Sequence, residues 1–306
     1  MEQTSRWRET EPWRHSGTGN RASQQQRRTN SSPLVRRLDE SDRFVLHTLL
    51  GTEPGYSIFL AANLCNFSLD ATFVRYWGAF DGRQLTSTLM MVGRRAALYA
   101  PPGVDVEPLA RTAAALSADF SMGRSDLVDA LLAASGSQRL ERREEHYLAE
   151  IAPPHEGALP VVVVPGAAIV RRATALDLEP LTHLYLGTDG FEQLSADQVR
   201  RTMAGRVHSL RTYVAEIDGH IVAGASTSAE TPAAAMIGGV WTAPAMRNRG
   251  YSTAVVAALA RELLEEQRRP YLFYLVDNVP AAHVYNRVGF HVVGPWSIAY
   301  LNGDTP

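Results

Sequence analysis

Apolar residues in the part of the chain after residue 166 recur with the periods of strands and helices in turn. The alternation predicts strands at 168–172, 212–217, 220–225, 234–241, 271–276 and 291–301, and helical spacing predicts helices near 177–186, 196–204 and 253–266. Asp218 and Gly219, between the second and third of these strands, are typical of a two-residue hairpin turn. Strands and helices in this order predict an α/β fold class, an α+β arrangement on a mixed sheet.

The part of the chain before residue 151 shows a fainter version of the same order. Strands predicted at 73–80, 85–92 and 96–99, with an Asp81-Gly82 turn, precede helices predicted at 107–116 and 126–132. Four prolines in 151–166 indicate a semi-rigid linker. We therefore expect a polar, disordered extension at 1–32, one α/β domain at 33–155 and a second at 156–306.

Composition excludes several classes of function. The formal net charge of −2 over 306 residues makes nucleic acid and membrane surfaces unexpected partners, and no apolar run reaches the length of a membrane span. All 30 basic residues are arginine, which excludes a Walker-type or Schiff-base lysine. Cys65, the single cysteine, excludes a cysteine-rich metal site, is expected to be buried and fits a cytoplasmic location. Arg142 and Arg143 are expected to be solvated surface charge.

The clearest chemical signal lies between residues 238 and 266. A strand that ends Val240-Trp241-Thr242 is followed by the turn Arg247-Asn248-Arg249-Gly250-Tyr251-Ser252 and by a helix from Thr253. The first N–H groups of a helix lack intrahelical partners, and together with the helix dipole they bind anions such as a diphosphate. Gly250 lets an anion approach the backbone, while Arg247 and Arg249 add positive charge. Taken alone, a turn of this kind before a helix is more often an ordinary surface loop with solvated charges.

A second motif follows about thirty residues later and is more specific. Asn278, Ala281, Tyr285, Gly289 and Phe290 have the spacing N-x-x-A-x-x-x-Y-x-x-x-G-F. Together with the earlier turn, this motif resembles the GCN5-related N-acetyltransferase (GNAT) superfamily, whose acyl-CoA motif is R/Q-x-x-G-x-G/A. Ser252 departs from that motif, because glycine or alanine is usual at its position.

The first domain resembles the degenerate N-terminal halves of tandem GNAT proteins in its order of elements. Its sequence Pro101-Pro102-Gly103-Val104-Asp105 stands where the arginine turn belongs, and a carboxylate there repels phosphate. The Asn/Tyr helix is also missing. An unrelated α+β domain is the alternative interpretation.

The resemblance implies a GNAT fold and an acyl-CoA-dependent N-acyltransferase. Acetyl-CoA is the implied co-substrate, and the acceptor is a primary amine on a small molecule or peptide that attacks directly in a ternary complex. The implied coenzyme-binding residues are Val240, Trp241, Thr242, Arg247, Asn248, Arg249, Gly250, Tyr251, Ser252, Thr253 and Asn278. A backbone amide at or near Val240 faces the thioester carbonyl. Tyr285 is the implied general acid for the departing thiolate, with a merely packed tyrosine as the alternative, and Asn278 either contacts the pantetheine or simply caps its helix.

The general base stays open, because 233–240 contains no ionisable residue. Water connected to bulk solvent is the leading expectation. Glu230 and His283 are also candidates, although residues of these types are more often surface residues. The expected acceptor wall, 177–208, carries aromatic and acidic residues that could bind an amine cation, although exposed polar residues of a helix and loop are the leading explanation. These residues are Tyr185, Asp189, Phe191 and Glu192. The alternative function is a non-catalytic acyl-CoA-binding or interaction module, which a missing base would explain.

Overall fold

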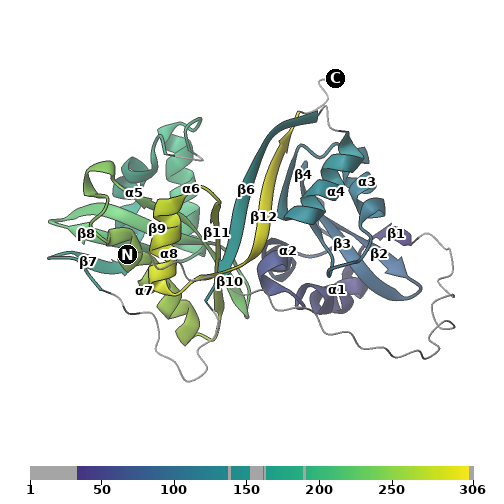
Figure 1. Ribbon diagram of the computed structural model, residues 1–306, viewed down its shortest axis with the longest axis horizontal. Helices are drawn as coiled ribbons and strands as arrows, with labels where there is room; N and C mark the ends of the chain where they lie inside the picture. The colour runs from purple at the N-terminus through teal and green to yellow at the C-terminus, as the bar shows by residue number, and fades with distance from the viewer. Residues whose placement is uncertain (1–32, 137–138, 152–160, 162, 189–190, 303–306) are drawn as a thin grey trace, which may run out of the picture. The chain divides into compact units, whose positions relative to one another are not determined.

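The computed structural model describes residues 33–136, 139–151, 161, 163–188 and 191–302. In this part of the chain the strands form one mixed sheet of twelve strands (Figure 1). The predicted extension 1–32 and the predicted domain boundary at 155/156 lie outside the described residues.

The first half of the sheet is built by residues 34–150. Its elements are β1 (Leu34–Arg37), the 3-10 helix η1 (Glu40–Asp42), α1 (Arg43–Leu50), α2 (Pro54–Asn66), β2 (Val74–Asp81), β3 (Gln84–Val92), β4 (Arg95–Tyr99), α3 (Glu107–Ala115), β5 (Phe120–Arg124), α4 (Ser125–Ser135) and β6 (Leu140–Glu150).

The second half is built by residues 169–301. Its elements are β7 (Ile169–Arg172), η3 (Ala175–Asp177), α5 (Leu178–Tyr185), α6 (Ala196–Ser209), β8 (Thr212–Ile217), β9 (His220–Glu230), β10 (Ala234–Thr242), η4 (Pro244–Met246), α7 (Tyr251–Glu265), β11 (Arg269–Leu275), α8 (Val279–Val288) and β12 (His291–Leu301). Apart from η4, the two halves have the same order of elements, which confirms the expected mixed α/β architecture in both.

The repeat extends to side chains at the start of each half. In the first, the Arg36 guanidinium donates two hydrogen bonds to the Asp42 carboxylate, at 2.7 and 2.6 Å. In the second, Arg171 donates two to Asp177, both at 2.8 Å. Each carboxylate also accepts from the backbone N–H three residues before it, which forms the same helix-capping arrangement. The pKa of both carboxyl groups is lowered chiefly by these arginine hydrogen bonds.

The last strands of the two halves are exchanged. The strand order is β1-β2-β3-β4-β5-β12-β6-β11-β10-β9-β8-β7, so β12 pairs with β5 of the first half and β6 pairs with β11 of the second. The two exchanged strands pair with each other in an antiparallel ladder, and Figure 1 shows them running side by side. Each half therefore completes its sheet with a strand that the other half supplies.

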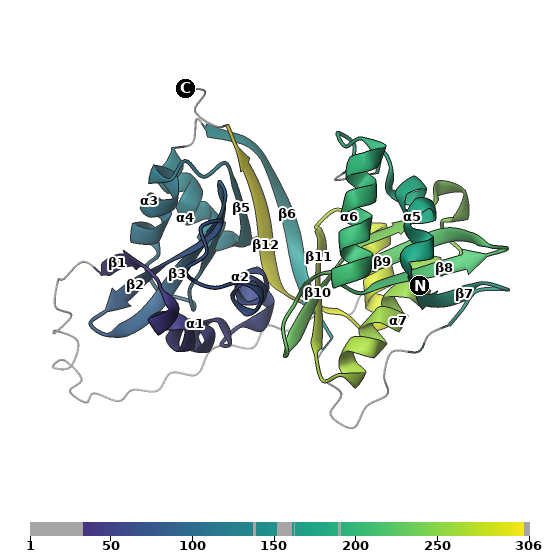
Figure 2. The same ribbon diagram turned by 180° about the vertical axis from the view of Figure 1, so that it is seen from behind.

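Helices cover both faces of the sheet in each half. In the second half, α7 and α8 cover one face in Figure 1, and Figure 2, seen from behind, shows α5 and α6 over the other. Val214 packs with α5 and α6, whereas its neighbour Ala215 packs with α7, because successive strand residues point to opposite faces. The first half repeats this layering, with Met90 in the cluster of α1 and α2 and Leu89 in that of α3.

Trp296 of β12 is the largest side chain at the exchange and is only 1% exposed. Its ring stacks on Phe273 of β11, with centroids 5.4 Å apart, and on Tyr56 of α2 at 6.2 Å. Aromatic stacking adds to the free energy gained by burying apolar area. The same cluster holds residues from both halves, so the exchange is fixed by side-chain packing as well as by the backbone ladder.

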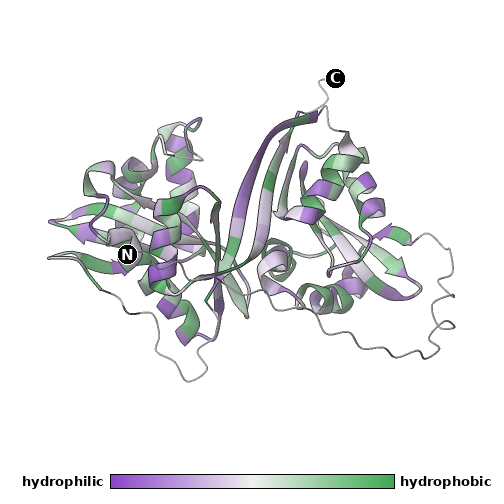
Figure 3. Ribbon diagram, viewed as in Figure 1, coloured by the Kyte–Doolittle hydropathy of each residue, from purple (hydrophilic) through white to green (hydrophobic). Residues whose placement is uncertain are grey.

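Two expectations from the sequence are wrong. Cys65, expected to be buried, is exposed at the C-terminal end of α2. Arg143, expected to be solvated surface charge, is only 26% exposed in β6 and pairs with Asp129 and Glu145. Arg142 is 59% exposed, as expected, and its guanidinium lies over the Tyr300 ring. Figure 3 shows this stretch of β6 as hydrophilic, which explains why no strand was predicted there. Among the described helices, none is both long and apolar enough to cross a bilayer.

The exchange predicts that both halves lose stability when Trp296 is truncated. Trp296→Ala is expected to cost about 3–5 kcal/mol, the usual range for removing a buried tryptophan. The matched control is Val292→Ala on the same strand, whose side chain is 47% exposed and whose loss should cost well under half as much. Urea unfolding followed by far-ultraviolet circular dichroism measures both. A Trp296→Ala variant that unfolds in two separate steps, one of them unshifted, would contradict the coupling of the two halves.

Candidate functional site

Strands β10 and β11 pair only along their first residues. The parallel ladder runs from Ala234 and Arg269 to Ile237 and Leu272, while β10 continues to Thr242 and β11 to Leu275. Beyond the last pair, β11 stays hydrogen-bonded to β6 as far as Leu275. The two strands therefore part, and the backbone of β10 after residue 237 is unpaired on the side that faces β11.

A bulge in β10 lies where the strands part. On its other side β10 pairs with β9, and Gly238 to Trp241 spans three steps where β9 spans two, Ser226 to Gly224. Gly239 has φ +59°. A positive φ is the glycine conformation found in one class of β-bulge. Tyr185 of α5 donates a hydrogen bond from its phenol to the Gly239 carbonyl, so the bulge is also held from the side of the helix.

The turn after β10 leads into α7 through two residues in the left-handed region. Asn248 has φ +60° and Gly250 has φ +86°; Gly250 is the N-cap of α7, and no side chain caps that end of the helix. The N–H groups of Tyr251, Ser252 and Thr253 thus form an uncapped helix start next to the parted strands, which is the arrangement that binds anionic groups. A Cβ at Gly250 would lie 3.4 Å from Pro165 Cγ.

Arginine side chains flank this helix start. Arg247 stacks on Trp241, with its guanidinium carbon 4.6 Å from the ring centroid, and donates from Nε to the Thr242 carbonyl at 3.3 Å. Arg249 is exposed. Thr242 itself is 9% exposed, and its hydroxyl has no hydrogen-bond partner within the described ranges. The predicted coenzyme-binding residues of β10 and the turn are therefore adjacent in the fold. In the described part of the chain, the Thr242 hydroxyl has no hydrogen-bond partner and no side chain caps the start of α7.

Asn278 is the N-cap of α8, where its Oδ1 accepts a hydrogen bond from the Ala281 N–H at 3.0 Å. This is one of the two roles that the sequence left open. A contact of Asn278 with pantetheine stays a prediction.

Tyr285 of α8 is 8% exposed and packs against Tyr274 and Phe290, with ring centroids 5.3 and 6.1 Å away. No described residue hydrogen-bonds to its hydroxyl. Burial raises the pKa of Tyr285 far above the usual value for tyrosine, with a smaller contribution from Tyr274. The phenol therefore remains protonated and able to donate throughout the physiological pH range.

The two candidate bases differ in their surroundings. Glu230 accepts hydrogen bonds from Arg211 at 2.7 Å, Arg268 at 2.9 Å and Thr227 at 2.6 Å, so both of its carboxylate oxygens are engaged. His283 is exposed on α8. Glu230 therefore serves an ion-pair network at the end of α7 that also includes Glu262 and Glu266.

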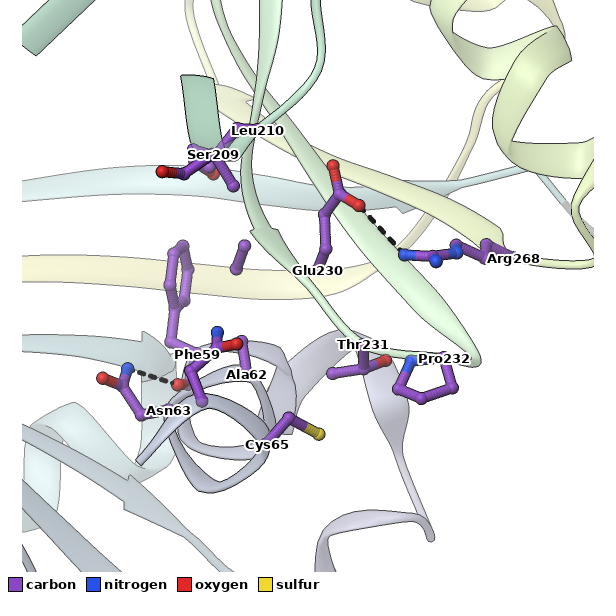
Figure 4. Close-up of a pocket in the computed structure, with 13 residues that line it drawn as sticks. Phe59, Ala62, Asn63, Cys65, Ser209, Leu210, Glu230, Thr231, Pro232 and Arg268 are labelled. Atoms are coloured by element: carbon purple, nitrogen blue, oxygen red, sulfur yellow. Dashed lines mark hydrogen bonds and ion pairs between the residues drawn. The ribbon is translucent and has the colours of Figure 1, made fainter. Parts of the chain in front are cut away.

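Glu230 and Arg268 also line a cavity of about 440 Å³ between α2 and the β9–β10 turn (Figure 4). Phe59 and Asn63 of α2 form the opposite wall, and Glu230 and Arg268 form an ion pair with each other on their side of the cavity. This cavity is separate from the parted strands, because none of the predicted coenzyme-binding residues lines it.

The predicted acceptor wall is more apolar than the sequence suggested. Tyr185 and Phe191 are buried, at 1% and 7% exposure, and Glu192 is exposed. Asp189 lies outside the described residues. A residue that sequence reasoning missed, Arg206 of α6, places its guanidinium carbon 5.3 Å from the Phe191 ring centroid and 6.0 Å from that of Tyr185. The available signal was its place on the buried face of α6, one helical turn after Met203 and two after Val199.

The equivalent opening in the first half is closed by side chains. Strands β4 and β5 pair only at Arg95–Phe120 and Ala96–Ser121, so they also part. There Glu53 accepts hydrogen bonds from both Tyr99 of β4 and Arg124 of β5, each at 3.1 Å.

The helix start that follows is also occupied by the chain itself. The Asp105 carboxylate accepts from the Glu107 N–H of α3 at 2.9 Å, where an anion would otherwise bind. The first half thus keeps the fold of the site without its binding groups.

Comparisons with known proteins agree with this geometry. Residues 177–290 match the family model described as Acetyltransferase (GNAT) family. No curated protein sequence matches the chain.

Several solved structures share the fold of both halves. A GCN5-related N-acetyltransferase from Sphaerobacter thermophilus has a TM-score of 0.60 at 16% identity, covering 87% of this chain and 94% of that chain. A tandem GNAT protein from the clavulanic acid biosynthesis pathway has a TM-score of 0.54 at 16% identity, covering 90% and 100%. A Drosophila protein has a TM-score of 0.63 at 12% identity, covering 88% and 98%. At these identities the likeness shows the fold alone.

The bulge predicts a sharp difference between two neighbouring glycines. Gly239→Ala must hold φ near +59°, and its Cβ would overlap the end of the Arg206 side chain, so we expect a loss of about 1–2 kcal/mol in the free energy of unfolding. Gly238→Ala is the control, because its Cβ would approach nothing closer than Ser228 Oγ at 3.6 Å. Chemical denaturation measures both variants. Equal losses at the two positions would show that the bulge does not depend on Gly239.

Proposed function

We propose that this protein, whose residues 177–290 form a domain of the acetyltransferase (GNAT) family, transfers an acetyl group from acetyl-CoA to a primary amine. Membership of that family supports acyl-CoA-dependent N-acyl transfer in general. The choice of acetyl, of an amine acceptor and of direct attack in a ternary complex is our proposal.

One observation carries the proposal: the parted strands β10 and β11 lead straight to the uncapped start of α7. An extended arm that ends in a diphosphate fits such a path, because unpaired backbone groups follow the arm and helix N–H groups receive the phosphates. Gly250 begins this helix with φ +86°, a conformation that glycine adopts without strain.

In this proposal, three groups of residues bind different parts of the coenzyme. The backbone of Val240, Trp241 and Thr242 binds the pantetheine arm. The residues around the helix start bind the diphosphate, namely Arg247, Asn248, Arg249, Gly250, Tyr251, Ser252 and Thr253. Asn278, which already caps α8, has its amide Nδ2 left to contact the arm.

Acetyl-CoA, when bound, supplies a thioester that an amine can attack. A backbone N–H at Val240, just beyond the Gly239 bulge, stabilises negative charge that develops on the carbonyl oxygen. Tyr285 donates its proton to the sulfur of the leaving thiolate, because burial keeps the phenol neutral. Removal of the proton from the amine is left to water, since the carboxylate of Glu230 is engaged by two arginines and His283 is exposed.

A non-catalytic acyl-CoA-binding module is the second candidate. The observation that favours it is the lack of a free base beside β10, where residues 233–240 carry no ionisable group. Both candidates require coenzyme binding at α7, and only the first requires a role for Tyr285.

Coenzyme binding is tested by comparing two glycines of similar conformation. Gly250→Ala places a methyl group at the helix start, whereas Gly219→Ala places one in the β8–β9 turn, where nothing lies within 4 Å. With φ of +86° and +76°, both substitutions strain the backbone to a similar extent. We expect titration calorimetry with CoA to show at least about a tenfold weaker Kd for Gly250→Ala only, about 1.4 kcal/mol. No heat with wild-type protein, or equal effects at both positions, would contradict the site.

The catalytic role is tested by Tyr285→Phe. Loss of a proton donor is expected to lower kcat about a hundredfold while Kd for CoA stays within about twofold. Tyr274→Phe, on the neighbouring buried ring, is the control and should leave kcat nearly unchanged. Because the pKa of Tyr285 is raised, kcat of the wild type should show no loss from its deprotonation up to about pH 10.

The assay needs direct quantification of CoA and acetylated amine by chromatography, because the exposed thiol of Cys65 reacts with thiol reagents. If wild type binds CoA but acetylates none of a panel of amines, amino acids and peptides, the binding-module candidate gains. An unchanged kcat in Tyr285→Phe removes the tyrosine from the mechanism.

A further inference from the structure

Arg206 of α6 is a partly buried cation with no carboxylate beside it in the described part of the chain. Its Nη1 atom is shielded from solvent and makes no hydrogen bond there. The guanidinium lies over the rings of Tyr185 and Phe191, and its Nη1 atom would overlap a Cβ placed on Gly239. These surroundings belong to the apolar cluster of α5, α6 and β8.

Several other arginines of similar or deeper burial are paired with carboxylates, whereas Arg75 and Arg139 each also hold a buried nitrogen without a hydrogen bond. Arg211 contacts Glu230, Glu262 and Glu266, and Arg124 contacts Glu53 and Asp126. Arg171 contacts Asp177 and Glu216. Taking a guanidinium out of water without a counter-charge costs free energy, which pairing with an anion recovers. Among the described residues, no carboxylate offsets that cost at Arg206.

The position of Arg206 says where the missing anion lies. Gly239 is the bulge residue immediately before Val240, at the point where β10 and β11 part. The diphosphate site lies at the other end of this path, around Gly250 and the first residues of α7. An anion bound to Arg206 would therefore lie near the thioester end of the proposed coenzyme site, away from the coenzyme phosphates.

The geometry points to a carboxylate on the acceptor: the amine that this site acetylates also carries a carboxylate, which pairs with Arg206. The inference rests on the proposed acetyl transfer and narrows its substrate to aminocarboxylates such as amino acids. A planar guanidinium suits a carboxylate because two N–H groups can donate to its two oxygens. Arg206 is of intermediate exposure and its Nη1 atom is shielded from solvent, so a ligand carboxylate would have to meet the rest of the guanidinium. The Tyr185 and Phe191 rings fix the other side.

In this inference Arg206 binds the acceptor carboxylate, and the fold does not depend on Arg206 for its stability. The aromatic contacts alone do not explain it, because a neutral side chain of similar length would pack against the same rings without the desolvation cost. The melting temperature of Arg206→Met therefore distinguishes a ligand-binding role of Arg206 from a structural one. A residue kept for a ligand leaves the melting temperature of the free protein equal or higher when replaced, whereas a structural residue lowers it.

The experiment uses matched acceptors with the full-length protein and acetyl-CoA. L-Amino acids are compared with their carboxamides and with the corresponding decarboxylated amines, and acetylated products are quantified by mass spectrometry. We expect wild type to prefer the carboxylate form by about 10- to 100-fold in kcat/KM, the range for a hydrogen bond to a charged group. In Arg206→Gln this ratio falls to near one, mainly through a higher KM for the carboxylate form. Arg201→Gln, an exposed arginine on the same helix, keeps the wild-type ratio.

Binding is read separately from turnover. Saturation-transfer nuclear magnetic resonance on the CoA-saturated protein is expected to show amino acids bound to wild type and not to Arg206→Gln, with carboxamides bound to neither. Arg206→Gln and Arg201→Gln should both bind CoA like wild type, which keeps the test independent of the coenzyme site. The inference is overturned if carboxylate and carboxamide acceptors bind and react equally, if no aminocarboxylate binds, or if Arg206→Met lowers the melting temperature. Failure of wild type to bind CoA would instead overturn the proposed function.

Discussion

The arrangement depends on how the backbone hydrogen bonds of β11 are satisfied. A strand that leaves its neighbour exposes unpaired N–H and C=O groups, which is costly in the middle of a sheet. Here β11 leaves β10 after Leu272 but remains paired with β6, a strand from the other half, through Leu275. The second half can hold an opening in its sheet because the first half supplies the strand that supports β11. The exchange of β6 and β12 thus links the fold of the whole described chain to the site.

The two halves use one architecture for different purposes. Both begin with the same arginine–aspartate pair, and both contain parallel strands that part after a few residues. In the first half Glu53 bridges the opening and the Asp105 carboxylate accepts from the first turn of the following helix, so the chain itself fills the places that correspond to those proposed for the coenzyme arm and phosphate. In the second half the same places hold an unpaired β10 edge and an uncapped helix. In the proposed function, a small number of side chains, and not the fold, separates a supporting domain from one that binds the coenzyme.

The elements that sequence patterns predicted well are those whose burial follows a simple period. β8 and β12 have the predicted bounds, and α7 begins two residues earlier than predicted. The pattern missed β1, α1, α2, β5 and β6. The first part of β6 alternates little because it is rich in arginine and glutamate, and α2 buries residues around most of its circumference, which removes the helical period.

The same distinction applies to the site. The turn at Gly250 and the Asn/Tyr helix could be predicted because their residues are close in sequence and their chemistry is local. The Gly239 bulge, its hydrogen bond from Tyr185 and the unpaired Arg206 could not, because each depends on contacts between α5, α6 and β10 that no local pattern specifies. Tyr185 was expected on a polar wall and instead supports the backbone beside the parted strands.

The central claim is that the opening between β10 and β11, together with the start of α7, binds the coenzyme. Hydrogen–deuterium exchange of the free and CoA-saturated protein tests it most directly. The account predicts slower exchange at residues 240–242 and 251–253 on adding CoA, with no change at the corresponding places of the first half, 97–99 and 105–107. Unchanged exchange at 240–242 and 251–253, or protection confined to the first half, would contradict it.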